Sequence, residues 1–268
     1  MQDLLLYYVR WFAIVCPLMF CTDATAEAVD KYWGAMQKEY FPGKVLQPST
    51  IVHLTAPQRA DSGEQVPFAF DIDYPTSADK FIKNVSIFVD ANPVPLAAIF
   101  HFTANGAKAE ISTRIRLESD SFVHVVAEAS DGMFYMNGIP IRASGGCGGA
   151  IDGDESAART DAGKMKLAVE KPVTMGRLNH INLLIKHPMY TGLQRDLVSQ
   201  GFRPAFFINK IEAKYNGVPI MQADIFIGIS ENPNLRFGLV ADAPGTFEVT
   251  IQDNEGKTFT KSIEVKDQ

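Results

Sequence analysis

The residue with the clearest chemical potential in this chain is Cys147, which lies in the segment SGGCGGA at positions 144–150. Gly145, Gly146, Gly148 and Gly149 flank it, so the thiol has no side-chain neighbours in the sequence and its backbone is almost unrestrained. This composition disfavours burial and favours presentation of the sulfur. We therefore expect an exposed, reactive thiol on a mobile segment; the alternative is a chance cysteine in a flexible linker.

The other two cysteines, Cys16 and Cys21, fall within a predicted export signal. The apolar run that contains them is too short to span a bilayer comfortably, and Ala24-Thr25-Ala26 follows it as a small-x-small cleavage site. We predict that residues 1–26 are removed and that the mature protein is soluble and periplasmic. A second apolar patch at 4–9 leaves an uncleaved anchor as an alternative.

An exported protein usually pairs its thiols, so a single remaining one is either reactive or partnered outside the chain. The sequence around Cys147 does not activate it: Arg142 is the nearest cation, and acidic residues follow at 152, 154 and 155. A thiol near its free pKa is only a few per cent thiolate at neutral pH. That suits a carrier loaded by other enzymes better than a self-activated nucleophile. The absence of a Cys-x-x-Cys motif disfavours a dithiol oxidoreductase.

Other candidate chemistry is sparse. The five histidines show no paired spacing typical of a metal site. His101 and His124 lie within strand patterns, where we expect structural roles. His187-Pro188-Met189 begins a turn. This is either a structural turn locked by the proline or a surface that meets the cysteine segment. We predict no metal ion, no cofactor and no catalytic residue.

The composition is that of a soluble globular protein, with 46% hydrophobic and 21% charged residues. The 268 residues suffice for one large domain or two of ordinary size. The net charge of −6 comes without a run of lysine and arginine, which disfavours nucleic acid as a partner.

Hydrophobic periodicity predicts the elements that position the thiol. Apolar residues recur at helical spacing over 28–40, and Pro42-Gly43 closes this short helix. Beyond it the period becomes two, which is typical of half-buried strands separated by turns. The expected strands are 66–72, 85–89, 99–102, 111–117 and 122–127, and then 181–185, 208–215, 218–220, 225–229, 235–240, 247–251 and 259–265.

Between the two strand series, residues 144–168 are dominated by glycine, alanine, serine and aspartate, which predicts a flexible linker. Asn216-Gly217 is a strong hairpin signal, and 253–256 marks another turn. We therefore predict an all-β fold of two antiparallel β-sandwiches, over 27–143 and 169–268, joined by a tether that carries the thiol.

Several stretches of the chain also carry a family resemblance. Residues 92–132, with IFHFT at 99–103 and TRIRL at 113–117, and the later GGCGG resemble SoxY, the sulfur-carrying subunit of the periplasmic sulfur-oxidation system. Residues 187–192 (HPMYTG), 215–217 (YNG) and 230–233 (SENP) resemble its partner SoxZ. The whole is similar to the fused SoxYZ-like carriers associated with quinoprotein dehydrogenases.

The resemblance implies a non-enzymatic carrier built from two immunoglobulin-like sandwiches that pack against each other. Cys147 would be the covalent attachment residue for sulfur intermediates such as those of thiosulfate oxidation. Gly145, Gly146, Gly148 and Gly149 would be the hinge of a swinging arm. Periplasmic sulfur-oxidation enzymes would be the partners.

One departure from SoxY leaves alternatives open. In SoxY the motif ends the chain, whereas here a whole domain follows it, so this arm must enter a partner as a hairpin. The cargo could therefore differ. The alternative function is a non-catalytic accessory module of a periplasmic quinoprotein (PQQ) alcohol dehydrogenase and cytochrome c system, with the thiol in a redox or incidental role. A disulfide-linked homodimer through Cys147 is also compatible with the sequence.

Overall fold

The computed structural model describes residues 31–143, 145–151 and 155–267, so the predicted signal peptide at 1–26 lies outside it. The helices of this part of the chain are α1 (Trp33–Tyr40) and α2 (Glu155–Asp161). The strands are β1 (Leu46–Pro48), β2 (Val52–Thr55), β3 (Val66–Ile72), β4 (Ile82–Val89), β5 (Leu96–Phe102), β6 (Glu110–Ile115), β7 (Ser121–Ala129), β8 (Phe134–Ile141), β9 (Ala150–Ile151), β10 (Lys164–Val169), β11 (Leu178–Lys186), β12 (Arg195–Asp196), β13 (Ile208–Tyr215), β14 (Val218–Ile225), β15 (Asn234–Val240), β16 (Gly245–Asp253) and β17 (Thr258–Val265).

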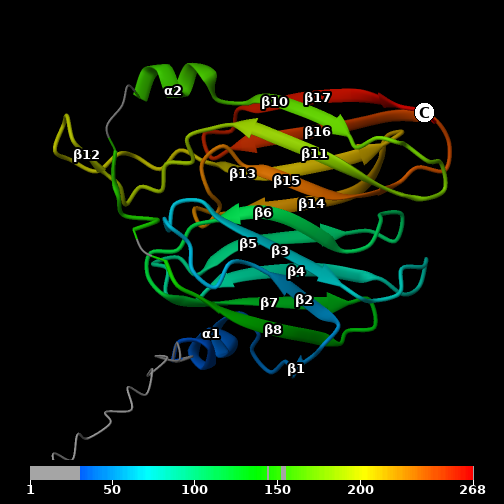
Figure 1. The fold of residues 1–268 in the computed structure, drawn as a ribbon, viewed down its shortest axis with the longest axis horizontal. Coiled ribbons are helices and arrows are strands. Elements are labelled where there is room, and N and C mark those ends of the chain that lie inside the picture. The colour runs from blue at the N-terminus through cyan, green and yellow to red at the C-terminus, as the bar shows by residue number, and fades with distance from the viewer. Residues whose placement is uncertain (1–30, 144, 152–154, 268) are drawn as a thin grey trace, which may run out of the picture.

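Two large sheets pack face to face, and each contains strands from both halves of the chain (Figure 1). The nine-stranded sheet has the order β1-β8-β7-β4-β5-β14-β13-β16-β17, and the six-stranded sheet has the order β10-β11-β15-β6-β3-β2. The halves meet where β5 pairs with β14 and where β6 pairs with β15, both antiparallel. The predicted all-β class is confirmed, and the two sandwiches prove to be continuous with each other.

Histidine–carboxylate pairs cross both of these junctions. His101 on β5 lies 2.9 Å from Asp224 on β14, and His180 on β11 lies 2.8 Å from Glu110 on β6. The predicted structural role of His101 is therefore confirmed.

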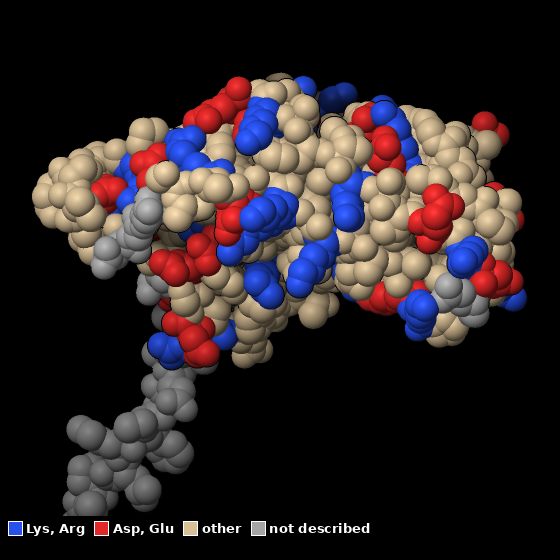
Figure 2. All heavy atoms as spheres, turned by 90° about the horizontal axis from the view of Figure 1, so that it is seen from above, with Lys and Arg blue, Asp and Glu red and all other residues tan. Residues whose placement is uncertain are grey.

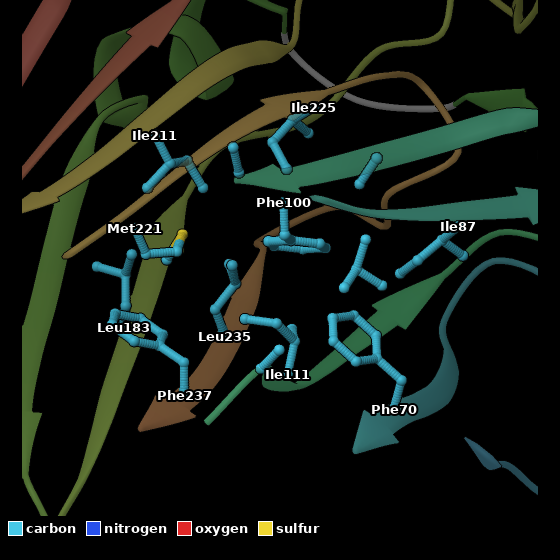
Figure 3. Packing of buried hydrophobic residues seen from close by; sticks show 14 of the residues in the cluster. Phe70, Ile87, Phe100, Ile111, Leu183, Ile211, Met221, Ile225, Leu235 and Phe237 are labelled. Carbon is cyan, nitrogen blue, oxygen red and sulfur yellow. The ribbon is translucent and has the colours of Figure 1, made fainter. Parts of the chain in front are cut away.

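The main core lies between the two sheets, because the alternation of each strand turns its apolar residues to the same side. Phe70, Phe100 and Ile111 from the first half and Leu235 and Phe237 from the second belong to one continuous cluster (Figure 3). Each such side chain contributes roughly 1.5–3 kcal/mol when it is fully buried. One core therefore stabilises both halves.

A smaller cluster lies under α1 at the far end of the nine-stranded sheet. Trp33 and Met36 are buried there beside Phe88, and the indole stacks on the ring of His124 at 4.1 Å. The Nδ1 atom of His124 lies 2.9 Å from the carboxylate of Asp90. His124 is thus a structural residue, as the sequence predicts.

Most predicted elements are confirmed, and of the helix expected at 28–40 the structure has α1 at residues 33–40. The Asn216-Gly217 hairpin is confirmed, since both residues have positive φ, +48° and +78°, as this tight turn requires. The strand expected at 225–229 is wrong beyond Ile225, where β14 ends. Ile227 and Ile229 are buried in a turn that is closed by the N–H of Ile229 donating to the carbonyl of Phe226.

The flexible linker predicted over 144–168 is wrong for the residues described, because they include β9, α2 and β10. Arg159 on α2 binds Glu155 one turn earlier at 2.7 Å and Glu255 in the β16–β17 turn at 2.8 Å. β10 pairs with β11 along its whole length and buries Leu167. Small side chains therefore form docked elements here, since distant residues supply the contacts. Among the residues described, no helix is long and apolar enough to cross a membrane.

Candidate functional site

Cys147 is buried, with 1% of its surface exposed. The expected presentation of the thiol on a mobile segment is therefore wrong for this structure. The cysteine segment, residues 145–149, lies docked at the boundary between the two halves, and its polar partners come from outside the segment. Its four glycines have no side chains to bury, so the docking acts on the backbone.

Glu118, just beyond β6, holds the segment through two backbone N–H groups. Its Oε2 atom accepts hydrogen bonds from the N–H of Cys147 at 2.7 Å and of Gly148 at 3.0 Å. Two backbone bonds lie beside them: the N–H of Gly145 donates to the carbonyl of Glu118, and the N–H of Gly146 to that of Leu117. Hydrogen bonds to a carboxylate are stronger than those to a neutral acceptor. Glu118 is therefore the strongest single contact of the docked segment.

Arg116, two residues before Glu118, binds carbonyl oxygens, whereas Glu118 binds the N–H groups of the cysteine segment. Its guanidinium donates to the carbonyls of Gly146 at 3.0 Å, of Met189 at 3.2 Å and of Ile229 at 3.4 Å. The side chain is 2% exposed, and burial lowers its pKa. Within the described residues no carboxylate lies at ion-pair distance from it, so carbonyl oxygens solvate this buried cation. Arg116 thereby ties the cysteine segment to the second half of the chain.

The second half contributes Thr191, whose hydroxyl donates to the carbonyl of Cys147 at 2.9 Å. Thr191 follows the turn that contains His187 and Met189. Met189 has a positive φ of +50°, and its N–H donates to Nδ1 of His187 at 3.1 Å. Burial lowers the pKa of His187 to about 4, so the ring is neutral near pH 7 and can accept this bond. The turn is thus fixed by His187, and Thr191 directly after it contacts the cysteine segment, as the second alternative expects. The lock by Pro188 stays a prediction.

Gly146 shows why glycine is needed on the docked side. A Cβ atom at this position would lie 2.6 Å from the carbonyl oxygen of Leu117 and would also collide with that of Gly63. Both obstacles are backbone atoms, which cannot move aside as a flexible side chain can. A Cβ at Gly148 would meet only the side chain of Glu118, at 3.3 Å. The hinge role predicted for Gly145, Gly146, Gly148 and Gly149 remains a prediction.

Burial raises the pKa of the Cys147 thiol to about 11, because charge is disfavoured in the interior. Arg116 acts in the opposite direction and Glu118 raises the pKa further. The sequence suggested a thiol near its free pKa, and the shift arises from contacts that are remote in sequence. The docked thiol is protonated and unreactive at neutral pH.

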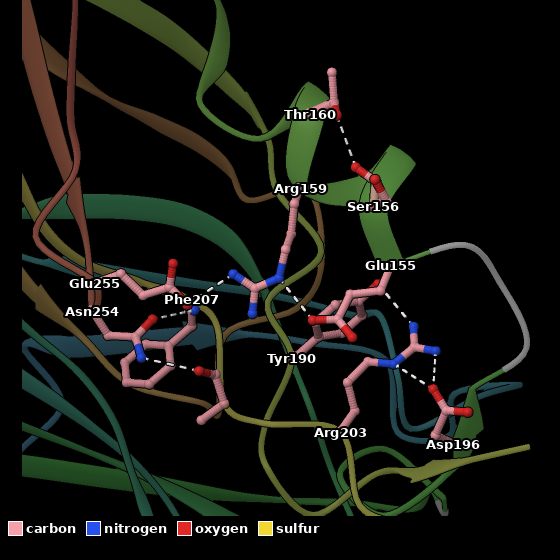
Figure 4. A network of polar contacts seen from close by, with 11 residues as sticks. Glu155, Ser156, Arg159, Thr160, Tyr190, Asp196, Arg203, Phe207, Asn254 and Glu255 are labelled. Carbon is pink, nitrogen blue, oxygen red and sulfur yellow. Dashed lines mark hydrogen bonds and ion pairs between the residues drawn. The ribbon is translucent and has the colours of Figure 1, made fainter. Parts of the chain in front are cut away.

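Downstream of the cysteine, β9 pairs in parallel with β12 of the second half, with Ala150 opposite Arg195 and Ile151 opposite Asp196. A polar network anchors this region to α2 and to the β16–β17 turn (Figure 4). In it, Arg203 donates to Asp196 at 2.9 Å and to the hydroxyl of Tyr190 at 3.0 Å. The chain is thus held firmly soon after it leaves the cysteine segment.

No group of three or more histidine, cysteine, aspartate and glutamate side chains that could hold a metal ion occurs among the described residues. On the face in Figure 2, basic and acidic side chains are interspersed rather than gathered into one basic surface.

Two family profiles match this chain in succession. "Sulfur oxidation protein SoxY" matches residues 37–147, ending on the buried cysteine, and "Sulphur oxidation protein SoxZ" matches residues 165–264. The chain contains a SoxY domain followed by a SoxZ domain. β5 and β6 belong to the SoxY match, whereas their partners β14 and β15 belong to the SoxZ match. The SoxY and SoxZ domains therefore share both large sheets.

The chain is also similar to solved structures over less than half of its length. The sulfur carrier protein SoxY from Chlorobium limicola f thiosulfatophilum is 27% identical, with a TM-score of 0.36; the match covers 42% of this chain and 91% of that one. A superoxide reductase (neelaredoxin) from Ignicoccus hospitalis is 11% identical, with a TM-score of 0.32, and covers 35% of this chain and 82% of that one. No curated protein matches the sequence. The domain assignment rests on the two family profiles.

Sequence reasoning identified Cys147 but missed the side chains that hold it. Arg116 and Glu118 lie on either side of Leu117 with period two, so both turn toward the docked segment while Leu117 enters the core. Both continue the polar side of the β6 alternation after Ser112 and Arg114, so nothing in the local sequence set them apart. Thr191 lay within the SoxZ-like motif, but nothing local connected it to the cysteine.

Proposed function

We propose that this protein is a periplasmic covalent carrier that holds sulfur intermediates on the thiol of Cys147 for processing by partner enzymes. The observation that carries the proposal is the placement of the one cysteine of the described residues where the SoxY match ends, at the seam with the SoxZ domain. The proposal includes export of the chain to the periplasm by the signal peptide at residues 1–26, which is then removed. The solved SoxY neighbour is itself described as a sulfur carrier protein.

The docked geometry supports a passive attachment residue rather than a nucleophile that activates itself. The thiol is buried and its pKa is about 11, so a partner must first draw the segment out into solvent. Loading with the sulfane sulfur of thiosulfate would form an S–S bond and release one proton and two electrons. A two-electron acceptor in the loading partner must take up those electrons. The proposal accordingly places the catalysis in the partners.

Intact-mass analysis of the protein isolated from its native periplasm tests this function. We expect sulfur adducts on Cys147 that a reducing agent removes, and none on a Cys147→Ser variant. Protein that carries only free thiol while sulfur compounds are being oxidised would contradict the proposal. Full physiological function of Cys147→Ser would instead favour the accessory role in a quinoprotein dehydrogenase system.

A further inference from the structure

A loop of the SoxZ domain exposes an unusual concentration of apolar side chains. This apolar loop, residues 193–202, includes β12 and carries Leu193, Leu197, Val198 and Phe202, which are 38%, 46%, 81% and 72% exposed. They are four of the twelve large hydrophobic residues that are exposed in the described part of the chain. Clustered apolar exposure on a soluble protein marks an interaction site, whereas isolated exposed residues do not.

The apolar loop is held in shape by Asp196. Its carboxylate accepts hydrogen bonds from the N–H groups of Val198 and Ser199, both at 2.8 Å, and from the guanidinium of Arg203 at 2.9 Å. These hydrogen bonds lower the pKa of Asp196 to about 2, and the bond from the N–H of Ser199 has the largest effect. The carboxylate therefore stays ionised. Its backbone N–H also donates to the carbonyl of Gly201 at 2.9 Å. A loop fixed in this way presents Val198 and Phe202 to solvent in a defined arrangement.

The apolar loop is also joined directly to the cysteine segment. β12 pairs with β9, and the N–H of Leu197 donates to the carbonyl of Ile151 at 3.2 Å. Ala150, which pairs with Arg195, is three residues from Cys147. A protein that binds the cysteine segment therefore approaches the side of the molecule that carries the apolar loop.

The size of the apolar surface indicates which kind of partner fits it. The four side chains expose on the order of 400 Å², the size of a functional patch on a typical monomer. A stable dimer buries about 800 Å² on each partner, so this surface suits a brief encounter better than a permanent second copy. The end of the molecule that holds β12 lies at the left of Figures 1 and 2, and its tip is mostly uncharged.

We propose that the apolar loop is the docking surface for the proteins that load or unload Cys147, and that these partners present an apolar surface of matching size. The inference rests on the proposed carrier function. Contact with the loop brings the partner to the downstream end of the cysteine segment, where it can capture the segment as it leaves Glu118 and Arg116.

The test compares two double variants with the wild-type protein in the native host. Val198→Asp with Phe202→Asp places charge on the apolar loop. Val45→Asp with Val218→Asp places the same charge on side chains that are 77% and 44% exposed elsewhere. We expect the fraction of Cys147 that carries a sulfur adduct, measured by intact mass, to fall at least fivefold in the loop variant alone.

Two further measurements separate docking from structural damage. The purified variants should react with a small disulfide reagent at the wild-type rate, which shows that the thiol and its docked segment are intact. Val198→Ile with Phe202→Leu should keep the wild-type adduct level, because the surface stays apolar. Wild-type loading of the charged loop variant would overturn the docking inference and leave the carrier function standing.

Other outcomes bear on different conclusions. A wild-type protein without any adduct would contradict the carrier function, and the inference would fall with it. A wild-type dimer in solution that the charged loop variant loses would assign the surface to a second copy of this chain and overturn the inference.

Discussion

At the residue scale, the docked segment depends on the carboxylate of Glu118. Replacing it by glutamine keeps the shape and removes the charge that strengthens the bonds from Cys147 and Gly148. A hydrogen bond to a charged group contributes about 1.5–3 kcal/mol, so loss of the charge should release the segment more often. We expect Glu118→Gln to raise the rate of thiol modification by Ellman's reagent about tenfold or more.

Glu64→Gln is the matched control, because Glu64 lies near Gly149 and its carboxylate accepts no hydrogen bond from the cysteine segment within the described residues. Its modification rate should stay close to that of the wild type. Equal rates in the wild type and in Glu118→Gln would show that Glu118 does not hold the segment in solution.

The raised pKa of Cys147 gives a pH dependence with a defined sign. The ordinary pKa is 9.0 and the docked pKa is about 11, so docking favours the protonated thiol. The docked state keeps this stabilisation below about pH 9 and loses it as the pH rises through about 11. A cysteine labelled with ¹³C at Cβ should titrate by NMR with a midpoint near 11 in the wild type and at a lower pH in Glu118→Gln, because release of the segment lowers the pKa of Cys147. A midpoint near 9 in both proteins would mean that the thiol is already exposed.

At the element scale, close packing of the cysteine segment requires glycine at position 146 more than at position 148. Gly146→Ala would drive Cβ into the carbonyls of Gly63 and Leu117, whereas Gly148→Ala meets only a flexible carboxylate. We expect Gly146→Ala to expose the thiol to alkylation at least tenfold more than Gly148→Ala does. The comparison uses iodoacetamide labelling followed by intact mass. Similar labelling of the two variants would indicate a segment that is undocked most of the time.

The strands could be predicted from the sequence because their alternation is local, as in β3 and β13. β8 was missed because Gly138 and Pro140 interrupt its pattern, although β1 and β7 pair with it on either side. α2 was missed because its sequence is polar and small, and its support comes from Glu255 in a distant turn. The thiol could likewise be found from its unpaired state, but its burial depends on long-range partners.

At the scale of the whole molecule, the shared sheets predict that the SoxY and SoxZ domains unfold together. Trp33 on α1 packs against Phe88 of the nine-stranded sheet, whereas β15 belongs to the six-stranded sheet. Phe237→Ala on β15 removes a ring from the common core and should lower the free energy of unfolding by about 3–5 kcal/mol. We expect the fluorescence of Trp33 to report a fall in Tm on the order of 10 °C.

The predicted mature chain makes this measurement direct, since Trp11 belongs to the export signal and Trp33 is the tryptophan that remains. An unchanged Trp33 transition beside a second, earlier one in circular dichroism would instead show two independently folding domains.

The short pairing of β9 with β12 limits how far Cys147 can move away from the rest of the protein. With β9 in place, Cys147 is three residues from its downstream anchor at Ala150, a reach of roughly 10 Å for an extended chain. If those two residues unpair, the upstream anchor at Ala143 becomes limiting and the reach grows to roughly 14 Å. If Cys147 is the attachment residue of the proposed carrier, an enzyme that acts on it has to hold its reactive centre close to its own surface, in a shallow and wide-mouthed depression.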